Sequence, residues 1–239
     1  MGEIRISPAK PTTKPFFDPW MGNGYRCARN ALLAGQSSCR DGLWHVMGES
    51  HYGTRADDRP TMTQDVMGRL ALAQNGYPFF DTLLMIVTGK ARTDLDRPAD
   101  WDGFAYSNFV QDVLPDDDRR PYKEHWRRAS DAFFAQLAIT RPKQLLVVGR
   151  TQWDNLPTSG YTPIETASPF GGDRIRDLGL YAYDVEGETA FTIATFIYHP
   201  SSRGKLNIND ARQHVRTVTT VSCNIIDAIR RDDEGWYIS

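Results

Sequence analysis

The sequence predicts one α/β domain with a mainly parallel sheet that is covered by helices on both faces. Short apolar runs, most of which end at a glycine or a polar cluster, alternate along the chain with longer segments of helical periodicity. Strands that alternate with helices form parallel sheets. The chain has 239 residues, of which 40% are hydrophobic and 24% are charged, and this suffices for one domain to bury a core.

The clearest strand is expected at 144–148 (QLLVV), an apolar run with a glycine after it. Apolar runs also predict strands at 43–48 (LWHVMG) and 191–198 (FTIATFIY). The segment 104–110 (FAYSNFV) fits either a strand or the loop after one. Residues 160–188 are rich in Gly, Pro and Asp, which is typical of a hairpin or a long loop.

The best amphipathic helix is expected at 121–139, where apolar residues recur at helical spacing. Residues 1–19 contain four prolines and little periodicity, so we expect an extended arm there and a single domain over 20–239. Further helices are expected at 61–74 with Thr61 as a candidate N-cap, at 77–88 before Gly89, at 151–156 and at 207–231.

The composition argues against several classes of protein. Cys27, Cys39 and Cys223 lie far apart in the sequence, which fits neither a disulfide framework nor a zinc site. An iron–sulfur cluster held by cysteine alone needs four thiolates, so we expect no metal and no cofactor. Because no apolar stretch is long enough to cross a membrane and no secretory signal is recognisable, we expect a cytoplasmic protein without a membrane partner.

The net charge of −2 is not that of a typical nucleic-acid-binding domain. Binding to DNA would therefore require a local concentration of positive charge. The stretch 203–216 is one candidate, although a solvated helix face has the same composition. Its basic residues are Arg203, Lys205, Arg212 and Arg216.

Three polar clusters follow predicted strands, at 48–53 (GESHYG), 107–108 (SN) and 199–202 (HPSS). In open parallel sheets, ligands bind beyond the carboxyl ends of the strands. The sequence therefore predicts that these three clusters contribute to one site.

Glu49, Asn108 and His199 give this site the groups needed to break an N-glycosidic bond. A carboxylate can stabilise the positive charge that develops on the sugar, or activate a water. A histidine can stabilise the departing base anion, and a side-chain amide can pair with the edge of a base. Each residue alone also fits a structural role, as a capping glutamate, a turn asparagine or a loop histidine bonded to the backbone.

Other side chains complete the expected site. Tyr52, Phe79 and Phe80 could stack on an extruded base, although Phe79 and Phe80 equally fit the core of an apolar helix. Ser50 and His51, which directly precede Tyr52, are also expected to contact the base. The residues expected to bind DNA phosphates are Ser201, Ser202, Arg203 and Lys205.

In order and spacing, four segments resemble motifs of the uracil-DNA glycosylase superfamily, namely HVMGESHYG, YSNFV, RPKQLLVVGRTQW and IYHPSSRGKL. The resemblance covers residues 42–230, and His-Pro-Ser after a strand is its most specific part. It implies a three-layer α/β/α sandwich with a short, mainly parallel four-stranded sheet, and hydrolysis without a metal. It also implies that Glu49 is the catalytic acid, that Asn108 reads the base and that His199 stabilises the leaving group. A wedge residue is implied among Arg203, Lys205 and Leu206.

The chain departs from the family pattern at several positions. Ser50 stands where the best-known branch keeps an aspartate, and His51 stands where proline is common. The cysteines for the iron–sulfur cluster of the thermostable branch are absent. The expected substrate is therefore DNA containing uracil or a modified cytosine. One candidate for the modified cytosine is glucosylated hydroxymethylcytosine of phage DNA. Excision of this base would imply a role in antiviral defence instead of DNA repair.

Two alternatives use the same residues differently. Gly48 to Gly53 nearly matches the nucleophile elbow of serine hydrolases, with Ser50 as nucleophile, His199 as base and Asp173, Asp177 or Asp184 as the third member of a triad. The other alternative is a non-catalytic DNA-binding protein of the same fold, because resemblance to a superfamily does not guarantee turnover.

Overall fold

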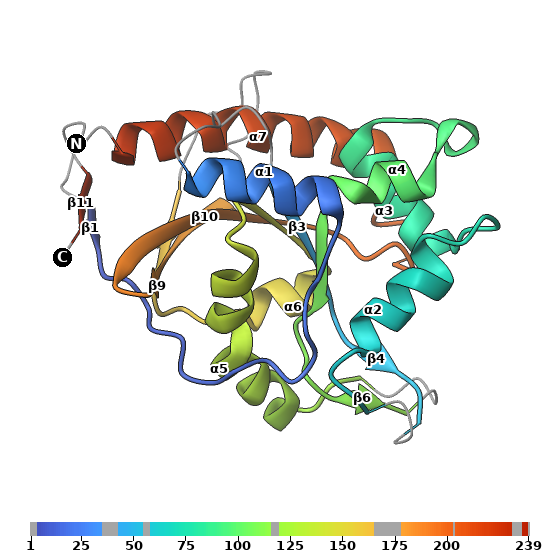
Figure 1. Ribbon diagram of the computed structural model, residues 1–239, viewed down its shortest axis with the longest axis horizontal. Helices are drawn as coiled ribbons and strands as arrows, with labels where there is room; N and C mark the ends of the chain where they lie inside the picture. The colour runs from blue at the N-terminus through green and yellow to red at the C-terminus, as the bar shows by residue number, and fades with distance from the viewer. Residues whose placement is uncertain are drawn as a thin grey trace.

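The structure is a computed structural model that describes residues 4–34, 43–54, 58–115, 120–164, 178–202, 204–230 and 236–238. Its centre is a seven-stranded sheet with helices on either side (Figure 1). In spatial order, the strands of this sheet are β2 (Trp20–Met21), β5 (Ala105–Asn108), β3 (Trp44–Gly48), β7 (Gln144–Val148), β10 (Glu188–Ile197), β9 (Leu178–Val185) and β8 (Tyr161–Pro163).

The sheet is mixed, which confirms the α/β class but corrects the expected strand number. β5, β3, β7 and β10 pair in parallel, whereas β2 at one edge and β9 and β8 at the other are antiparallel to their neighbours. The expected sheet of four strands was wrong because the sheet continues on both sides. β2 and β8 have two and three residues, too few to produce a periodic pattern.

The helices agree with most of the sequence-based predictions. The expected single helix at 61–74 is instead a short α-helix that continues into a π-helix, and Thr61 makes no side-chain capping bond. The helices at 23–33 and 97–102 were not anticipated. The helices are α1 (Asn23–Leu33), α2 (Met62–Val66), η2 (Met67–Ala71, π-helix), α3 (Pro78–Thr88), η3 (Arg92–Asp94, 3-10 helix), α4 (Arg97–Asp102), α5 (Lys123–Thr140), α6 (Arg150–Asp154) and α7 (Ile208–Arg230).

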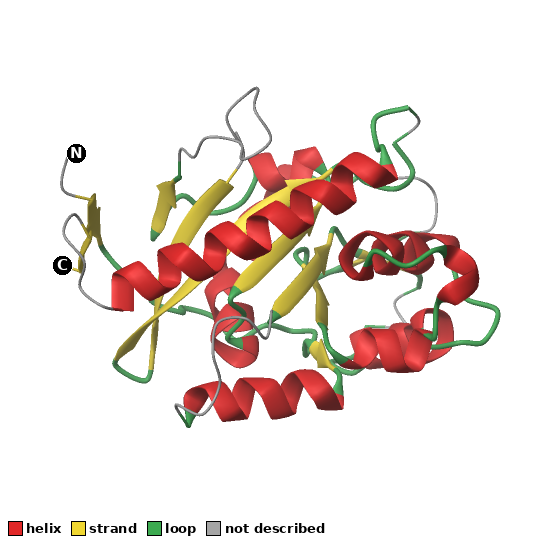
Figure 2. Cartoon of the chain, turned by 90° about the horizontal axis from the view of Figure 1, so that it is seen from above, coloured by secondary structure: helices red, strands yellow, loops and turns green. Residues whose placement is uncertain are grey.

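The two larger parts of the core lie on opposite faces of the sheet, because alternate strand residues point to opposite sides. On one face, α3 and α7 pack against Val46 and Leu146, and Figure 2 shows the long helix α7 lying across the strands. On the other face, α5 packs against Met47 and Val147. Because both faces are covered, the ends of the strands are the places where the sheet can meet a ligand.

Two small parallel strand pairs lie outside the main sheet. β4 (His51–Tyr52) pairs with β6 (Val113–Leu114), and β1 (Ile4–Ile6) pairs with β11 (Trp236–Ile238) near the two ends of the chain. Among the described residues, no helix has the length and apolar composition that a membrane span requires.

The N-terminal segment lies along the domain and is held at several points. Ala9 forms a β-bridge with Tyr183 of β9, and the Thr12 hydroxyl donates to the carbonyl of Asp131 in α5 at 3.2 Å. The Phe17 side chain is buried, with 1% of its surface exposed. These contacts attach the segment before β2 to the domain.

Two buried histidines are expected to make stability depend on pH. Burial lowers the pKa of His45 to about 3 and that of His51 to about 4, below the value of about 6.5 in an unfolded chain. Between about pH 4 and 6.5 the unfolded chain therefore binds protons that the folded protein does not, so stability falls as the pH falls. We expect the free energy of unfolding to decrease by up to roughly 1.4 kcal/mol per pH unit for each histidine.

Denaturant unfolding at a series of pH values measures this slope. His51→Gln should reduce the slope relative to the wild type, because it removes one of the two buried imidazoles. A slope that is the same in wild type and His51→Gln would contradict the role given to His51.

Candidate functional site

Glu49, Asn108 and His199 lie at the carboxyl ends of three parallel strands. Asn108 is the last residue of β5, Glu49 follows β3, and His199 is two residues beyond β10. Asn108 is paired with Gly48 in the register of the sheet, and β7 separates β3 from β10. Because neighbouring strands are about 4.8 Å apart, β3 and β10 are separated by about 10 Å within the sheet.

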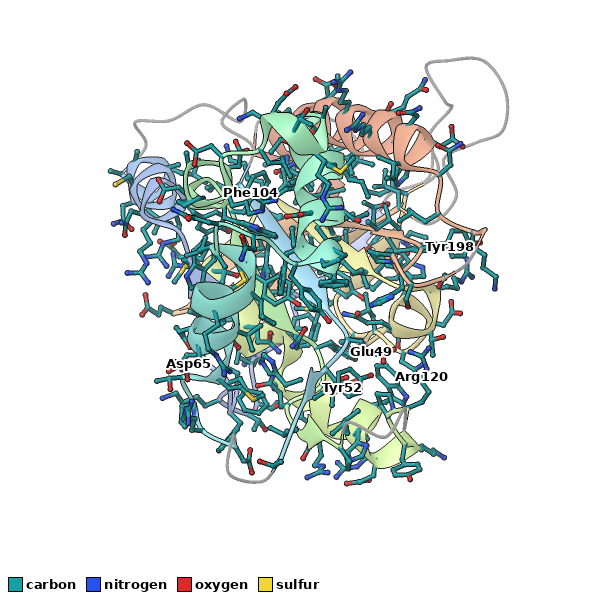
Figure 3. All side chains as sticks on the ribbon, turned by 90° about the vertical axis from the view of Figure 1, so that its right-hand side faces the viewer. Glu49, Tyr52, Asp65, Phe104, Arg120 and Tyr198 are labelled. Atoms are coloured by element: carbon teal, nitrogen blue, oxygen red, sulfur yellow. The ribbon has the colours of Figure 1, made fainter. Side chains whose placement is uncertain are left out.

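The Glu49 carboxylate is held by one of its two oxygens. Oε1 accepts hydrogen bonds from the Tyr52 hydroxyl at 3.2 Å and from the Arg120 guanidinium at 3.4 Å, and Figure 3 shows these three side chains close together. The N–H of Val110 donates to the Glu49 carbonyl at 2.9 Å, which fixes the backbone. No described residue donates to Oε2, so this oxygen can meet a substrate or a water.

Asn108 is held in a similar way. Its side chain is buried, and Oδ1 accepts from the Tyr106 hydroxyl at 3.0 Å. Burial raises the pKa of Tyr106, so the phenol keeps its proton. A Cβ on Gly48 would lie 2.3 Å from Asn108 Oδ1 and 2.4 Å from the Tyr106 hydroxyl, so this pair requires a glycine at the end of β3. No described residue accepts from Nδ2 of Asn108.

His199 is oriented by the chain that follows it. The N–H of Ser201 donates to Nδ1 at 3.1 Å, and the Ser201 hydroxyl lies 2.7 Å from the same nitrogen. Because Nδ1 accepts, the proton of the neutral ring is on Nε2. Burial, followed by the positive charge of Arg120, lowers the pKa of His199. The Phe79 ring lies 5.1 Å from the imidazole at 30°, and no described residue accepts from Nε2.

The middle strand, β7, ends at a glycine between Glu49 and His199. Gly149 has φ of +127°, a conformation that favours glycine. Among the described residues, a Cβ at this position would approach only the Cβ of His199, at 3.8 Å. The lack of a side chain at Gly149 therefore leaves the end of β7 unobstructed between the acid and the imidazole.

Two of the expected base-binding residues lie apart from this group. His51 is buried, its Nε2 is 3.0 Å from the Thr63 hydroxyl, and its ring packs edge-on against Phe17. Phe80 is 3% exposed and packs in the core against Tyr106. Both side chains thus lie in the interior of the protein. Direct contact with a base remains a prediction for them.

Ser50 is close to the group but has no hydrogen bond of normal geometry. Its hydroxyl is buried and has no hydrogen-bond partner among the described residues, although it lies near enough to the Tyr52 phenol to influence the pKa of that phenol. Burial is the main cause that raises the pKa of Tyr52, so the phenol stays protonated and donates to Glu49.

The loop after His199 is folded by its own backbone. The N–H of Ser202 donates to the His199 carbonyl at 2.8 Å, and the N–H of Lys205 donates to the Ser202 carbonyl at 3.1 Å. Lys205 is exposed, and Arg203 lies outside the described residues. Contact of this loop with phosphates stays a prediction.

Arg212, the third basic residue of the stretch 203–216, has structural partners. Arg212 donates through Nε to the Met85 carbonyl at 2.7 Å and through Nη2 to the Lys90 carbonyl. This guanidinium therefore links α7 to the end of α3.

A cavity of about 300 Å³ lies between the N-terminal segment and α5. Its lining includes Lys14, Phe16, Gln111 and Arg128 but none of the three candidate residues. It is therefore separate from the site at the strand ends.

The described residues do not form the triad that a serine hydrolase requires. The Ser50 hydroxyl has no hydrogen bond, and Nδ1 of His199 accepts from a backbone N–H instead of donating to a carboxylate. Asp184 accepts from the N–H of Gly187 in the turn between β9 and β10. The other two candidate aspartates, Asp173 and Asp177, lie outside the described residues.

Over the ranges that the structure describes, no group of three or more His, Cys, Asp and Glu side chains is arranged to hold a metal ion. Neither Cys27 nor Cys223 takes part in a disulfide, and Cys39 lies outside those ranges.

Sequence reasoning missed Arg120 and Tyr106. The sequence could have indicated Tyr106. Residues two apart on a strand face the same side of the sheet, so Tyr106 is expected beside Asn108. Arg120 lies 71 residues from Glu49 in the chain and follows a run of charged residues, so no local pattern distinguished it.

No model of a known protein family matches the chain, and a search of curated proteins finds none that matches its sequence.

Proposed function

We propose that the protein is a DNA glycosylase that hydrolyses the N-glycosidic bond of an extruded uracil or modified cytosine and leaves an abasic site. The arrangement of Glu49, Asn108 and His199 carries the proposal. In each residue, one side-chain atom is hydrogen-bonded to the protein, namely Oε1 of Glu49, Oδ1 of Asn108 and Nδ1 of His199. The other polar atoms, Oε2, Nδ2 and Nε2, have no hydrogen-bond partner among the described residues. A carboxylate, an amide and a neutral imidazole can together perform base excision, as acid–base group, base reader and stabiliser of the leaving anion.

The proposed reaction adds water to C1′ of the sugar as the bond to the base nitrogen breaks. Glu49 stabilises the positive charge on the sugar and accepts a proton from the attacking water. The electron pair of the broken bond goes to the base, and His199 donates a hydrogen bond from Nε2 to a carbonyl oxygen of that anion. The released base then takes a proton from solvent.

Asn108 is the proposed reader of the base. With Oδ1 held by Tyr106, Nδ2 is a donor, which suits the O4 acceptor of uracil. The opposite orientation of the amide would present an acceptor to the N4 amino group of cytosine. The choice between these substrates therefore depends on which side-chain atom of Asn108, Oδ1 or Nδ2, is hydrogen-bonded to the Tyr106 hydroxyl.

The resemblance to the uracil-DNA glycosylase superfamily supports the same reaction. On this view, the four mutually parallel strands β5, β3, β7 and β10 correspond to the family's sheet, and β2, β9 and β8 extend it.

An abasic-site assay tests the proposal. The protein is incubated with oligonucleotides containing uracil, with phage DNA containing glucosylated hydroxymethylcytosine, and with unmodified DNA as a control. We expect abasic sites in one of the two modified DNAs, and the responding DNA separates a repair role from antiviral defence. DNA binding without abasic sites in either would favour the non-catalytic alternative.

Gly48→Ala tests whether the Tyr106–Asn108 pair positions the base. Because the new Cβ would overlap both side chains, we expect base release to slow roughly 100-fold, the effect of a misplacement of about 1 Å. Gly68→Ala is the matched control, because a Cβ there meets nothing within 4 Å. Single-turnover rates that are equal in the two variants would contradict the positioning role.

A further inference from the structure

Arg120 is an exposed cation beside the proposed catalytic carboxylate. Its side chain is 76% exposed, whereas that of Glu49 is 13% exposed. A single contact of 3.4 Å joins its Nη1 to Glu49 Oε1. A guanidinium has five N–H donors in a planar fork, so most of its hydrogen-bonding capacity is not used by this contact.

The guanidinium contacts the acid and acts electrostatically on the imidazole. Its positive charge lowers the pKa of His199 and opposes the rise in the pKa of Tyr52, so both rings lie within its electrostatic range. Figure 3 shows Arg120 beside Glu49 on the same face as Tyr52. An anion that approaches the free oxygen of Glu49 therefore comes close to Arg120.

A site that contains a carboxylate needs a cation if it is to receive a polyanion. The net charge of −2 provides no general attraction for DNA. Arg212 is bound to two carbonyls of the protein, and Ser201 is bound to His199. Arg120, by contrast, is largely exposed, and its one ion pair among the described residues is long, so it can exchange this partner at little cost.

We propose that Arg120 binds a backbone phosphate of DNA beside the extruded nucleotide, and that it exchanges Glu49 for this phosphate when DNA binds. This inference rests on the proposed function. The exposure of Arg120 selects a phosphate over the base, because the base must enter toward the buried Asn108 while phosphates stay in solvent. A guanidinium also matches phosphate in a two-pronged hydrogen bond.

The test compares Arg120→Gln with Arg127→Gln in binding to a single-stranded uracil-containing oligonucleotide. Arg127 is a matched control, because it is also exposed and ion-paired, to Glu124 and Asp131 on α5, so each variant loses one positive charge. We expect Arg120→Gln to raise the Kd about tenfold more than Arg127→Gln does. The slope of log K against log salt should decrease by about 0.7, as for the loss of one phosphate contact on a single strand.

Arg120→Lys should recover part of the affinity, because it keeps the charge but not the fork. Equal Kd values and equal salt slopes for Arg120→Gln and Arg127→Gln would overturn the inference, as would absence of binding by the wild type. If base release occurs but Arg120→Gln binds DNA like Arg127→Gln, the inference fails and the proposed function stands. If binding depends on Arg120 but no DNA loses a base, the phosphate site stands and the proposed function fails.

Discussion

Replacing Glu49 by glutamine is expected to slow base release by roughly 100- to 1,000-fold. Glutamine has nearly the same shape and can still accept the hydrogen bond from Tyr52, so the geometry around Oε1 is kept. It lacks the negative charge that stabilises the cationic sugar, and it cannot take a proton from water. The effect should therefore appear in the single-turnover rate, measured as abasic sites formed over time with excess protein.

A second carboxylate provides the control for this variant. Glu124 is exposed on α5 and pairs with Arg127, so Glu124→Gln removes the same charge away from the site. The rate of this control should match the wild type. A rate for Glu49→Gln within a few-fold of the control would show that Glu49 does not act on the reacting atoms.

Replacing His199 by alanine is expected to have an effect of similar size, a loss of roughly 100- to 1,000-fold in rate. The contacts to Nδ1 place the proton of the neutral ring on Nε2, where it can donate to the anion of the leaving base. Because this interaction strengthens as charge develops on the base, its loss should lower kcat more than it raises KM. Steady-state kinetics on the responding DNA separates the two constants.

Ser201→Ala tests whether orientation of the ring matters. This variant loses the hydroxyl next to Nδ1 but keeps the backbone N–H that donates to it. We expect a loss of about tenfold or less, the effect of one ordinary hydrogen bond. If His199→Ala retained near-normal kcat, or if Ser201→Ala were the more damaging variant, the role of the imidazole would have to be abandoned.

The central elements of the fold could be predicted because each has a strong local pattern. β7 is a continuous apolar run, and α3 ends at Gly89 in a left-handed conformation (φ of +75°). The edges of the sheet could not be predicted in this way. β2 is fixed by its pairing with β5, and β8 by its pairing with β9, so tertiary contacts decide the conformation of these short segments.

The positions of the three candidate residues at the strand ends could be predicted from the sequence. Parallel pairing brings the carboxyl ends of β3, β5 and β10 to the same end of the sheet, where Glu49, Asn108 and His199 lie. The contacts that orient them are of two kinds. Those from Tyr106 and Ser201 lie two residues away in sequence, whereas the contact from Arg120 depends on a chain path that spans 71 residues.

The most direct test of the account is mass spectrometry of both products from one uracil-containing or glucosylated DNA. If the three residues act on a single extruded nucleotide, the wild type should release one free base for each abasic site, and Glu49→Gln should release the same base far more slowly. DNA that remains intact in both samples, with no free base detected, would contradict the claim that this edge of the sheet is a glycosylase site.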